Sequence, residues 1–81
     1  MDFRLALSLE LLEQCRRRSL TLGQLSAKAD VPVSTLKNII NGQSRNPGIL
    51  TLRALCGGLE ISLADFIAEL EETAKEPERD S

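Results

Sequence analysis

Apolar residues recur at helical spacing in five segments of the chain, and the first of these has the widest apolar arc. Within residues 3–18 two neighbouring sets follow i, i+3 and i, i+4 steps, one being Leu5, Leu9 and Leu12, and the other Leu7, Leu11 and Cys15. On the opposite side we expect Glu10, Glu13, Gln14 and Arg17. An arc this wide predicts a helix that packs on more than one neighbour.

The next two segments are short and follow each other closely. Thr21 and Gln24 have the spacing of a capping box, in which each side chain bonds the backbone N–H of the other, so a helix is predicted from Thr21 to about Ala29. Pro32 suits the first turn of a helix. A third helix is therefore predicted over residues 32–41, ended by a glycine cap at Gly42.

Two further helices complete the pattern. The fourth is predicted from about Ile49 to Cys56, where Gly57-Gly58 should stop it. The fifth is predicted to begin after a Ser62 cap, and its inner face is Leu63, Phe66, Ile67 and Leu70. No strand-like alternation is present, so the fold class is all-α. Residues 1–73 are expected to form one domain, and the polar, proline-broken residues 74–81 a disordered tail.

Charge is distributed unevenly although the net charge is only −2. Residues 14–59 carry seven Lys and Arg against the single acid Asp30, whereas residues 60–81 carry eight acids against Lys75 and Arg79. A basic block of this kind favours nucleic-acid binding, and it is stronger evidence than the slightly negative net charge, which would argue against such binding. Arg16, Arg17 and Arg18 are candidates for contacts at the flank of such a surface.

Composition argues against several other classes of protein. The chain has no His, two distant Cys and no phosphate-cradling glycine loop, so we expect no enzyme activity, no metal and no cofactor. Its only aromatics are Phe3 and Phe66, which disfavours stacking on single-stranded bases. No apolar run is long enough to span a membrane and no signal peptide is recognisable, so a cytoplasmic location and no membrane partner are expected.

The second and third predicted helices meet the demands of a helix-turn-helix. Ser26 is small enough for a close helix crossing, and Asp30 tolerates the left-handed turn. Leu36 and Ile39 form the inward pair of the third helix. The outward face is polar and consists of Ser34, Lys37, Asn38 and Asn41, with Val33 and Thr35 at its margins.

At these residues the sequence resembles the Cro/phage-repressor (XRE-type) helix-turn-helix DNA-binding family of bacteria and phages. The resemblance covers residues 7–70 and rests on Ser-Thr-Leu at 34–36, Asn-Gly at 41–42, Asn-Pro at 46–47, and the run Ile-Ser-Leu with Phe66 at 61–66. It implies a compact five-helix domain with helix 32–41 in the major groove of double-stranded DNA. The implied base-contacting residues are Val33, Ser34, Lys37 and Asn38. The implied phosphate-contacting residues are Thr21, Thr35, Asn41, Arg45 and Asn46.

The resemblance also implies a small transcriptional regulator, expected to be a repressor and a homodimer. No ligand or sensor domain is recognisable in the sequence, so no small-molecule ligand is expected. Candidate dimer surfaces are the apolar arc of residues 3–18, Leu22, Leu50 and the fifth helix. Leu22 stands where many members carry a Gln that contacts DNA, so one usual contact is missing. An alternative function is a protein-interaction module, similar to an antitoxin, that uses the same scaffold and binds DNA only weakly.

Overall fold

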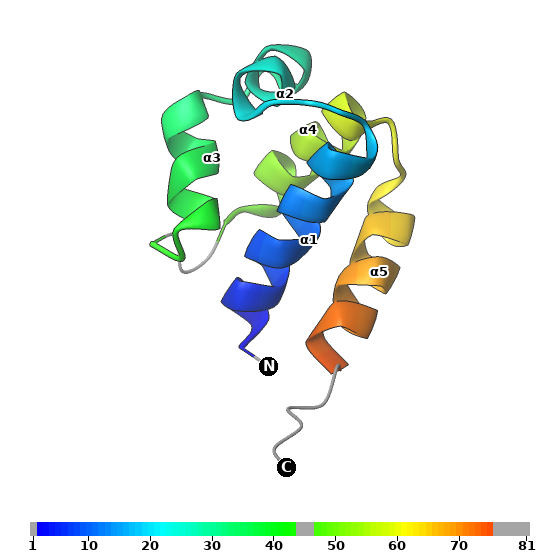
Figure 1. The fold of residues 1–81 in the computed structure, drawn as a ribbon. Helices are drawn as coiled ribbons and strands as arrows, with labels where there is room; N and C mark the ends of the chain where they lie inside the picture. The colour runs from blue at the N-terminus through cyan, green and yellow to red at the C-terminus, as the bar shows by residue number, and fades with distance from the viewer. Residues whose placement is uncertain (1, 44–46, 76–81) are drawn as a thin grey trace.

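The computed structural model describes residues 2–43 and 47–75, and this part of the chain consists of five helices without strands. The helices are α1 (Phe3–Arg17), α2 (Leu22–Ala29), α3 (Val33–Ile40), α4 (Ile49–Leu59) and α5 (Leu63–Lys75). Figure 1 shows their order in space. The predicted all-α class and the five helices are therefore confirmed, with differences at several boundaries.

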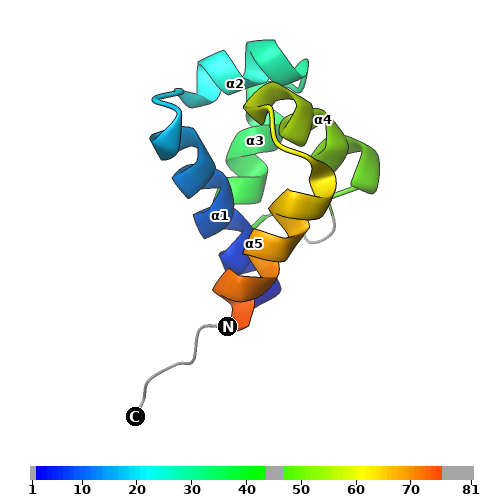
Figure 2. The same ribbon diagram turned by 90° about the vertical axis from the view of Figure 1, so that its right-hand side faces the viewer.

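The helices form two packed groups around one core. α2 packs mainly on α4, while α1 lies between α3 on one flank and α5 on the other (Figures 1 and 2). α3 stands at the edge of the molecule, with one side toward α1 and α2 and the other facing away (Figure 1).

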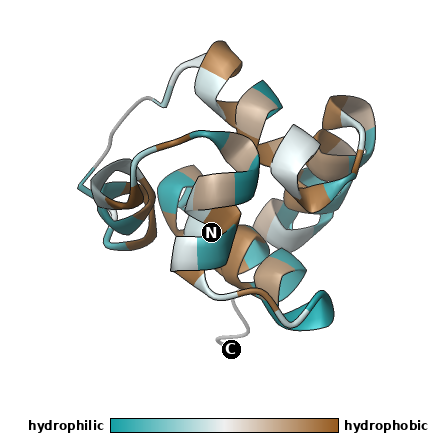
Figure 3. Cartoon of the chain, turned by 90° about the horizontal axis from the view of Figure 1, so that it is seen from above, coloured by the Kyte–Doolittle hydropathy of each residue, from teal (hydrophilic) through white to brown (hydrophobic). Residues whose placement is uncertain are grey.

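The core is built from apolar side chains of all five helices. Each helix ribbon alternates between hydrophobic and hydrophilic residues, as amphipathic helices do (Figure 3). The fully buried large side chains include Leu11, Leu25, Leu36, Leu55 and Phe66. Cys15 and Cys56 are also buried and free, and burial raises the pKa of both thiols. They therefore behave as small core residues.

The prediction for α1 was right that the helix packs on more than one neighbour, α3 and α5, but wrong about the extent of its buried side. Leu7, Leu11 and Cys15 are in the core, but Leu5, Leu9 and Leu12 are 51%, 42% and 43% exposed. Two of the polar residues placed on the solvent side are instead buried, since Glu10 is only 4% exposed and Gln14 is 0% exposed.

Partners on α5 explain why α1 buries polar groups. The Gln14 side-chain amide donates to Glu10 at 2.7 Å and to Glu69 of α5 at 2.9 Å. The Thr73 hydroxyl, also on α5, donates to the other oxygen of Glu10 at 3.0 Å. Burial of polar groups is tolerated when they are hydrogen-bonded. The side of α1 that carries Glu10 and Gln14 therefore faces α5, and the leucines at positions 5, 9 and 12 are left exposed to solvent.

The end of α4 also differs from the prediction. Gly57-Gly58 does not stop the helix, which continues to Leu59 and ends at Glu60 in the left-handed conformation (φ 59°). Gly58 serves packing instead, because a Cβ at this position would lie 2.9 Å from the Cβ of Ala29 on α2. The absence of a side chain allows α2 and α4 to approach closely.

α5 begins as predicted. The Ser62 hydroxyl accepts a hydrogen bond from the backbone N–H of Asp65 at 3.0 Å. The helix continues to Lys75, two residues beyond Thr73, and Ala74 packs against the core. The division of the chain at residue 73 stays a prediction, because residues 76–81 lie outside the described part.

Candidate DNA-binding surface

The start of α2 is fixed by the predicted capping box. The backbone N–H of Gln24 donates to the Thr21 hydroxyl at 3.1 Å, and the backbone N–H of Thr21 donates to the Gln24 side chain at 2.9 Å. Both bonds satisfy donors that a helix start would otherwise leave unpaired. Thr21 is exposed and remains open to a second partner.

The turn between α2 and α3 is held by Ser26 and Asp30. Asp30 adopts the left-handed conformation, with φ 58° and ψ 43°, as expected for the turn residue. The Ser26 hydroxyl donates to the carbonyl oxygen of Val31 at 2.6 Å, and the backbone N–H of Val31 donates to the Ser26 carbonyl oxygen at 3.1 Å. These bonds determine the direction in which the chain enters α3.

α3 lies within the predicted range, with Pro32 and Asn41 as its flanking caps. Leu36 and Ile39 point inward and are 0% and 2% exposed, as predicted. Leu25 of α2 is also fully buried in the same core. α3 is thus attached by its apolar side and leaves a polar side free.

The outward side of α3 brings several predicted site residues together. Ser34, Lys37 and Asn38 are exposed, and Val33 and Thr35 are half-buried at the margins. Lys37 forms no ion pair within residues 2–43 and 47–75. The predicted base-contacting set therefore occupies one accessible face, and its contacts with DNA stay predictions.

The other predicted phosphate-contacting residues lie around this face or outside the described chain. Asn41 is exposed at the end of α3, where its backbone N–H bonds the Lys37 carbonyl oxygen at 2.9 Å. Gly42 follows with φ 74° and closes the helix as expected. Arg45 and Asn46 are among residues 44–46, which lie outside the described residues.

Several cations of the basic block are paired with acids from other parts of the chain. Arg16 and Arg17 both bind Glu13, at 2.6 and 3.1 Å, and Arg17 also binds Glu69 of α5 at 2.9 Å. Arg18 donates to the Leu59 carbonyl oxygen at 2.6 Å. The cluster expected at the flank is thus engaged within the domain, so counting charges by segment overestimates the positive charge available to a partner.

Sequence reasoning missed one contact that positions α3. The Ser8 hydroxyl of α1 donates to the carbonyl oxygen of Ile40, the last residue of α3, at 2.8 Å. Ser8 is only 6% exposed. A lone serine within an apolar arc was the available signal, because a buried hydroxyl needs a partner. α3 is thus held near both ends, by Ser26 through the turn and by Ser8 at its last carbonyl.

No group of three or more His, Cys, Asp or Glu side chains within residues 2–43 and 47–75 could hold a metal ion. Among the same residues, none of the helices has the length and apolar character needed to cross a membrane.

Comparisons with known proteins agree with this geometry. A helix-turn-helix family model matches residues 11–66. The fold is similar to the crystal structure of a point mutant of the restriction-modification controller protein C.Esp1396I, with a TM-score of 0.83. The two chains are 20% identical, and the match covers 95% of this chain and 98% of that one. No curated protein sequence matches the chain. Because the family match spans more than half of the sequence, the chain belongs to the XRE-type helix-turn-helix family of DNA-binding transcription regulators.

Proposed function

We propose that the protein binds double-stranded DNA sequence-specifically, reads the major groove with α3, and represses transcription. The observation that carries this proposal is the outward face of α3. This face presents Ser34, Lys37 and Asn38 to solvent. Its cation, Lys37, has no acidic partner in the described residues. The width of the major groove of B-DNA admits an α-helix carrying such a face.

Each residue of this face has a chemical role in the proposal. Asn38 can form a bidentate pair with N6 and N7 of adenine, and Lys37 can donate to O6 or N7 of guanine. Val33, half-buried at the start of α3, can contact a thymine methyl group, and Ser34 can bond to either kind of base. Four adjacent side chains of this kind suit a short stretch of base pairs.

Phosphate contacts hold the domain on the duplex in this proposal. Thr35 lies at the margin of the face, Asn41 ends it, and Arg45 and Asn46 follow it in the sequence. Thr21 stands at the start of α2, where the helix dipole favours an anion. These contacts set the orientation of α3 and carry little sequence information themselves.

Repression and dimerisation complete the proposal. Repression needs only that an operator be occupied, which a DNA-binding domain can achieve without an additional activity. A homodimer would place two copies of α3 on two half-sites about one helical turn apart, and would double the number of base contacts. A pseudo-palindromic operator follows from this symmetry.

Selection of duplexes from a random library by the purified protein tests the proposed function. We expect enrichment of a defined motif with two related half-sites, and elution from heparin only as salt rises. Failure to enrich any motif, together with passage through heparin at physiological salt, would contradict the proposal. That outcome would favour the protein-interaction module as the function of the scaffold.

A further inference from the structure

Asn38 lies on the outward face of α3 with a side chain that has no partner in the described chain. The residue is exposed, and its side-chain amide forms no hydrogen bond within residues 2–43 and 47–75. Its backbone carbonyl oxygen is paired, because the backbone N–H of Gln43 donates to it at 2.9 Å. The amide therefore keeps both a donor and an acceptor for a partner outside the domain.

The backbone that carries Asn38 is held in place on its C-terminal side. Ile39, the next residue, is only 2% exposed, and its carbonyl oxygen accepts a hydrogen bond from the backbone N–H of Gly42 at 3.1 Å. The carbonyl oxygen of Ile40 accepts from the Ser8 hydroxyl at 2.8 Å. Asparagine has a single methylene group between its backbone and its amide. The amide of Asn38 therefore cannot retreat far from a group that takes up space beside a contacted base.

The adenine contact in the proposed function uses both polar atoms of this amide. The Asn38 oxygen accepts from N6 of adenine, and the amide nitrogen donates to N7. In a duplex one hydrogen of N6 is bonded to thymine, so one hydrogen of N6 remains for the asparagine oxygen. A methyl group on N6 that preserves base pairing must replace this remaining hydrogen. It removes the donor and places a carbon atom where the oxygen of Asn38 would lie.

We propose that the protein distinguishes adenine from N6-methyladenine through Asn38, so that methylation of its operator at this base weakens binding. The inference rests on the proposed function, since α3 must read the major groove, and it adds a chemical modification of the DNA that regulates the same site. On methylated DNA the Asn38 oxygen would be enclosed without a donor, which is unfavourable. Loss of a bidentate contact corresponds to a decrease in affinity of roughly ten- to a hundredfold.

Lys37, on the same face, should not sense this methyl group. An ammonium group has donors only, so it selects the O6 and N7 acceptors of guanine and does not bond the N6 donor of adenine. Lys37 is exposed and, like Asn38, belongs to the middle of α3. The two residues are neighbours in the chain but differ in the base atoms that they can bond. Sensitivity to adenine methylation is thus expected of Asn38 and not of the cation beside it.

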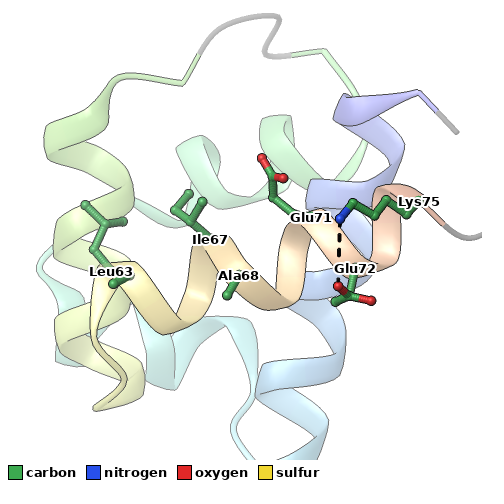
Figure 4. A pocket seen from close by; sticks show the side chains of 7 residues that line it. Leu63, Ile67, Ala68, Glu71, Glu72 and Lys75 are labelled. Carbon is green, nitrogen blue, oxygen red and sulfur yellow. Dashed lines mark ion pairs between the residues drawn. The ribbon is translucent and has the colours of Figure 1, made fainter.

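The hollow along α5 is less suited to regulating DNA binding. Figure 4 shows this hollow with its acidic end, where Lys75 pairs with Glu72 at 4.0 Å. Leu63 and Ile67 in its lining are half-buried and already pack against the core. Nothing in this lining selects one ligand, and α1 lies between α5 and α3 (Figure 1). The α3 face, in contrast, presents an amide whose complementary base is defined by chemistry.

Synthetic duplexes test the inference with the wild-type protein. Each duplex has the selected sequence with N6-methyladenine at one adenine, and affinity is measured by fluorescence anisotropy at one fixed salt concentration, because salt alone changes DNA affinity. We expect an adenine in each half-site at which methylation weakens binding roughly ten- to a hundredfold. At the same adenine, 7-deazaadenine removes the N7 acceptor and should also weaken binding. This second probe needs no protein variant, so it decides the question if a variant does not fold.

Two variants assign the effect to one residue. Asn38→Ala should bind the methylated and unmethylated duplexes alike, whereas Lys37→Ala, the matched control, should bind both more weakly and keep the wild-type ratio between them. The inference is overturned if no adenine is sensitive to methylation, if the sensitive adenine tolerates 7-deazaadenine, or if the ratio survives in Asn38→Ala. Sequence-specific binding would still stand in each of these cases. If the unmethylated duplex binds no more tightly than a scrambled one, the proposed function is wrong and the inference is overturned with it.

Discussion

Ser8 of α1 and Ile40 of α3 are joined by a hydrogen bond of 2.8 Å between the serine hydroxyl and the last carbonyl oxygen of α3. The bond spans 32 positions of the sequence and is partly buried, with Ser8 only 6% exposed. Carbonyls at a helix end have no partner within the helix, so an outside donor is needed when the end is buried. α1 thus determines where the end of α3 lies.

Replacement of Ser8 by alanine should loosen α3 as well as destabilise the fold. The variant leaves the Ile40 carbonyl without its donor, at a cost of about 1–3 kcal/mol in the free energy of unfolding, measured by urea denaturation. Ser62→Ala is the matched control, since it removes a cap of α5 and costs about 1 kcal/mol. DNA affinity measured well below both melting temperatures should fall for Ser8→Ala and stay unchanged for Ser62→Ala. Equal affinities in the two variants would show that Ser8 does not position α3.

The inward side of α3 should be essential for folding. Leu36 is fully buried, so Leu36→Ala leaves a cavity and should lower the free energy of unfolding by about 2–5 kcal/mol. In a domain of this size that is a large share of the total stability. Leu50→Ala is the same chemical change at a leucine that is 76% exposed, and thermal unfolding should shift little. Similar melting temperatures for the two variants would be inconsistent with α3 packing by this side.

Two adjacent glycines of α4 should respond oppositely to alanine. Gly58→Ala places a methyl group 2.9 Å from the Ala29 Cβ and should destabilise the domain by about 1–3 kcal/mol. At Gly57 an added Cβ meets nothing within 4 Å, so Gly57→Ala should stabilise the helix by about 0.5–1 kcal/mol. Calorimetric melting of both variants measures the difference. Stabilisation by both substitutions would mean that α2 and α4 are farther apart than described.

Glu13 should titrate far below an ordinary glutamate. Hydrogen bonds from Arg16 and then Arg17 lower its pKa from 4.5 to about 2. Because the folded-state pKa is depressed, the stabilisation from these pairs is present above pH 4.5 and is lost as the pH falls through 2. A carbon-detected NMR titration of the Glu13 carboxyl measures this pKa. Arg16→Gln should raise it, and a wild-type value near 4.5 would contradict the described pairing.

Local sequence signals were sufficient for most of the helices and for the helix-turn-helix. The Thr21–Gln24 capping box, the left-handed Asp30 and the buried pair on α3 all follow from chemistry within a few residues of each site. Such features are predictable because the interacting groups are neighbours in the sequence.

The errors concern contacts between distant segments. The two apolar sets of α1 both follow helical spacing, so periodicity alone could not show that only one of them is buried. The decision depends on Gln14 and Glu10 meeting Glu69 and Thr73 of α5. Gly58 was likewise assigned as a helix stop, since a pattern along one segment contains no information about Ala29 on α2.

The available positive charge was overestimated for the same reason. Counting residues 14–59 as a block ignores Glu13, Glu60 and Glu69, which pair with Arg16, Lys28 and Arg17 of that block. Acids outside the block thus reduce its charge at the surface. Lys37 is the cation of α3 that the described residues leave without an acidic partner, which makes the α3 face more important to the proposed function.

Titration of the Asn38→Ala variant against the selected duplex and a scrambled duplex tests the central claim most directly. Alanine favours helix more than asparagine does, so the variant should fold. We expect it to lose about 1–3 kcal/mol of affinity for the selected duplex and little for the scrambled one, whereas Arg45→Ala should weaken binding to both alike. If Asn38→Ala binds both duplexes as the wild type does, α3 is not the element that reads the DNA sequence.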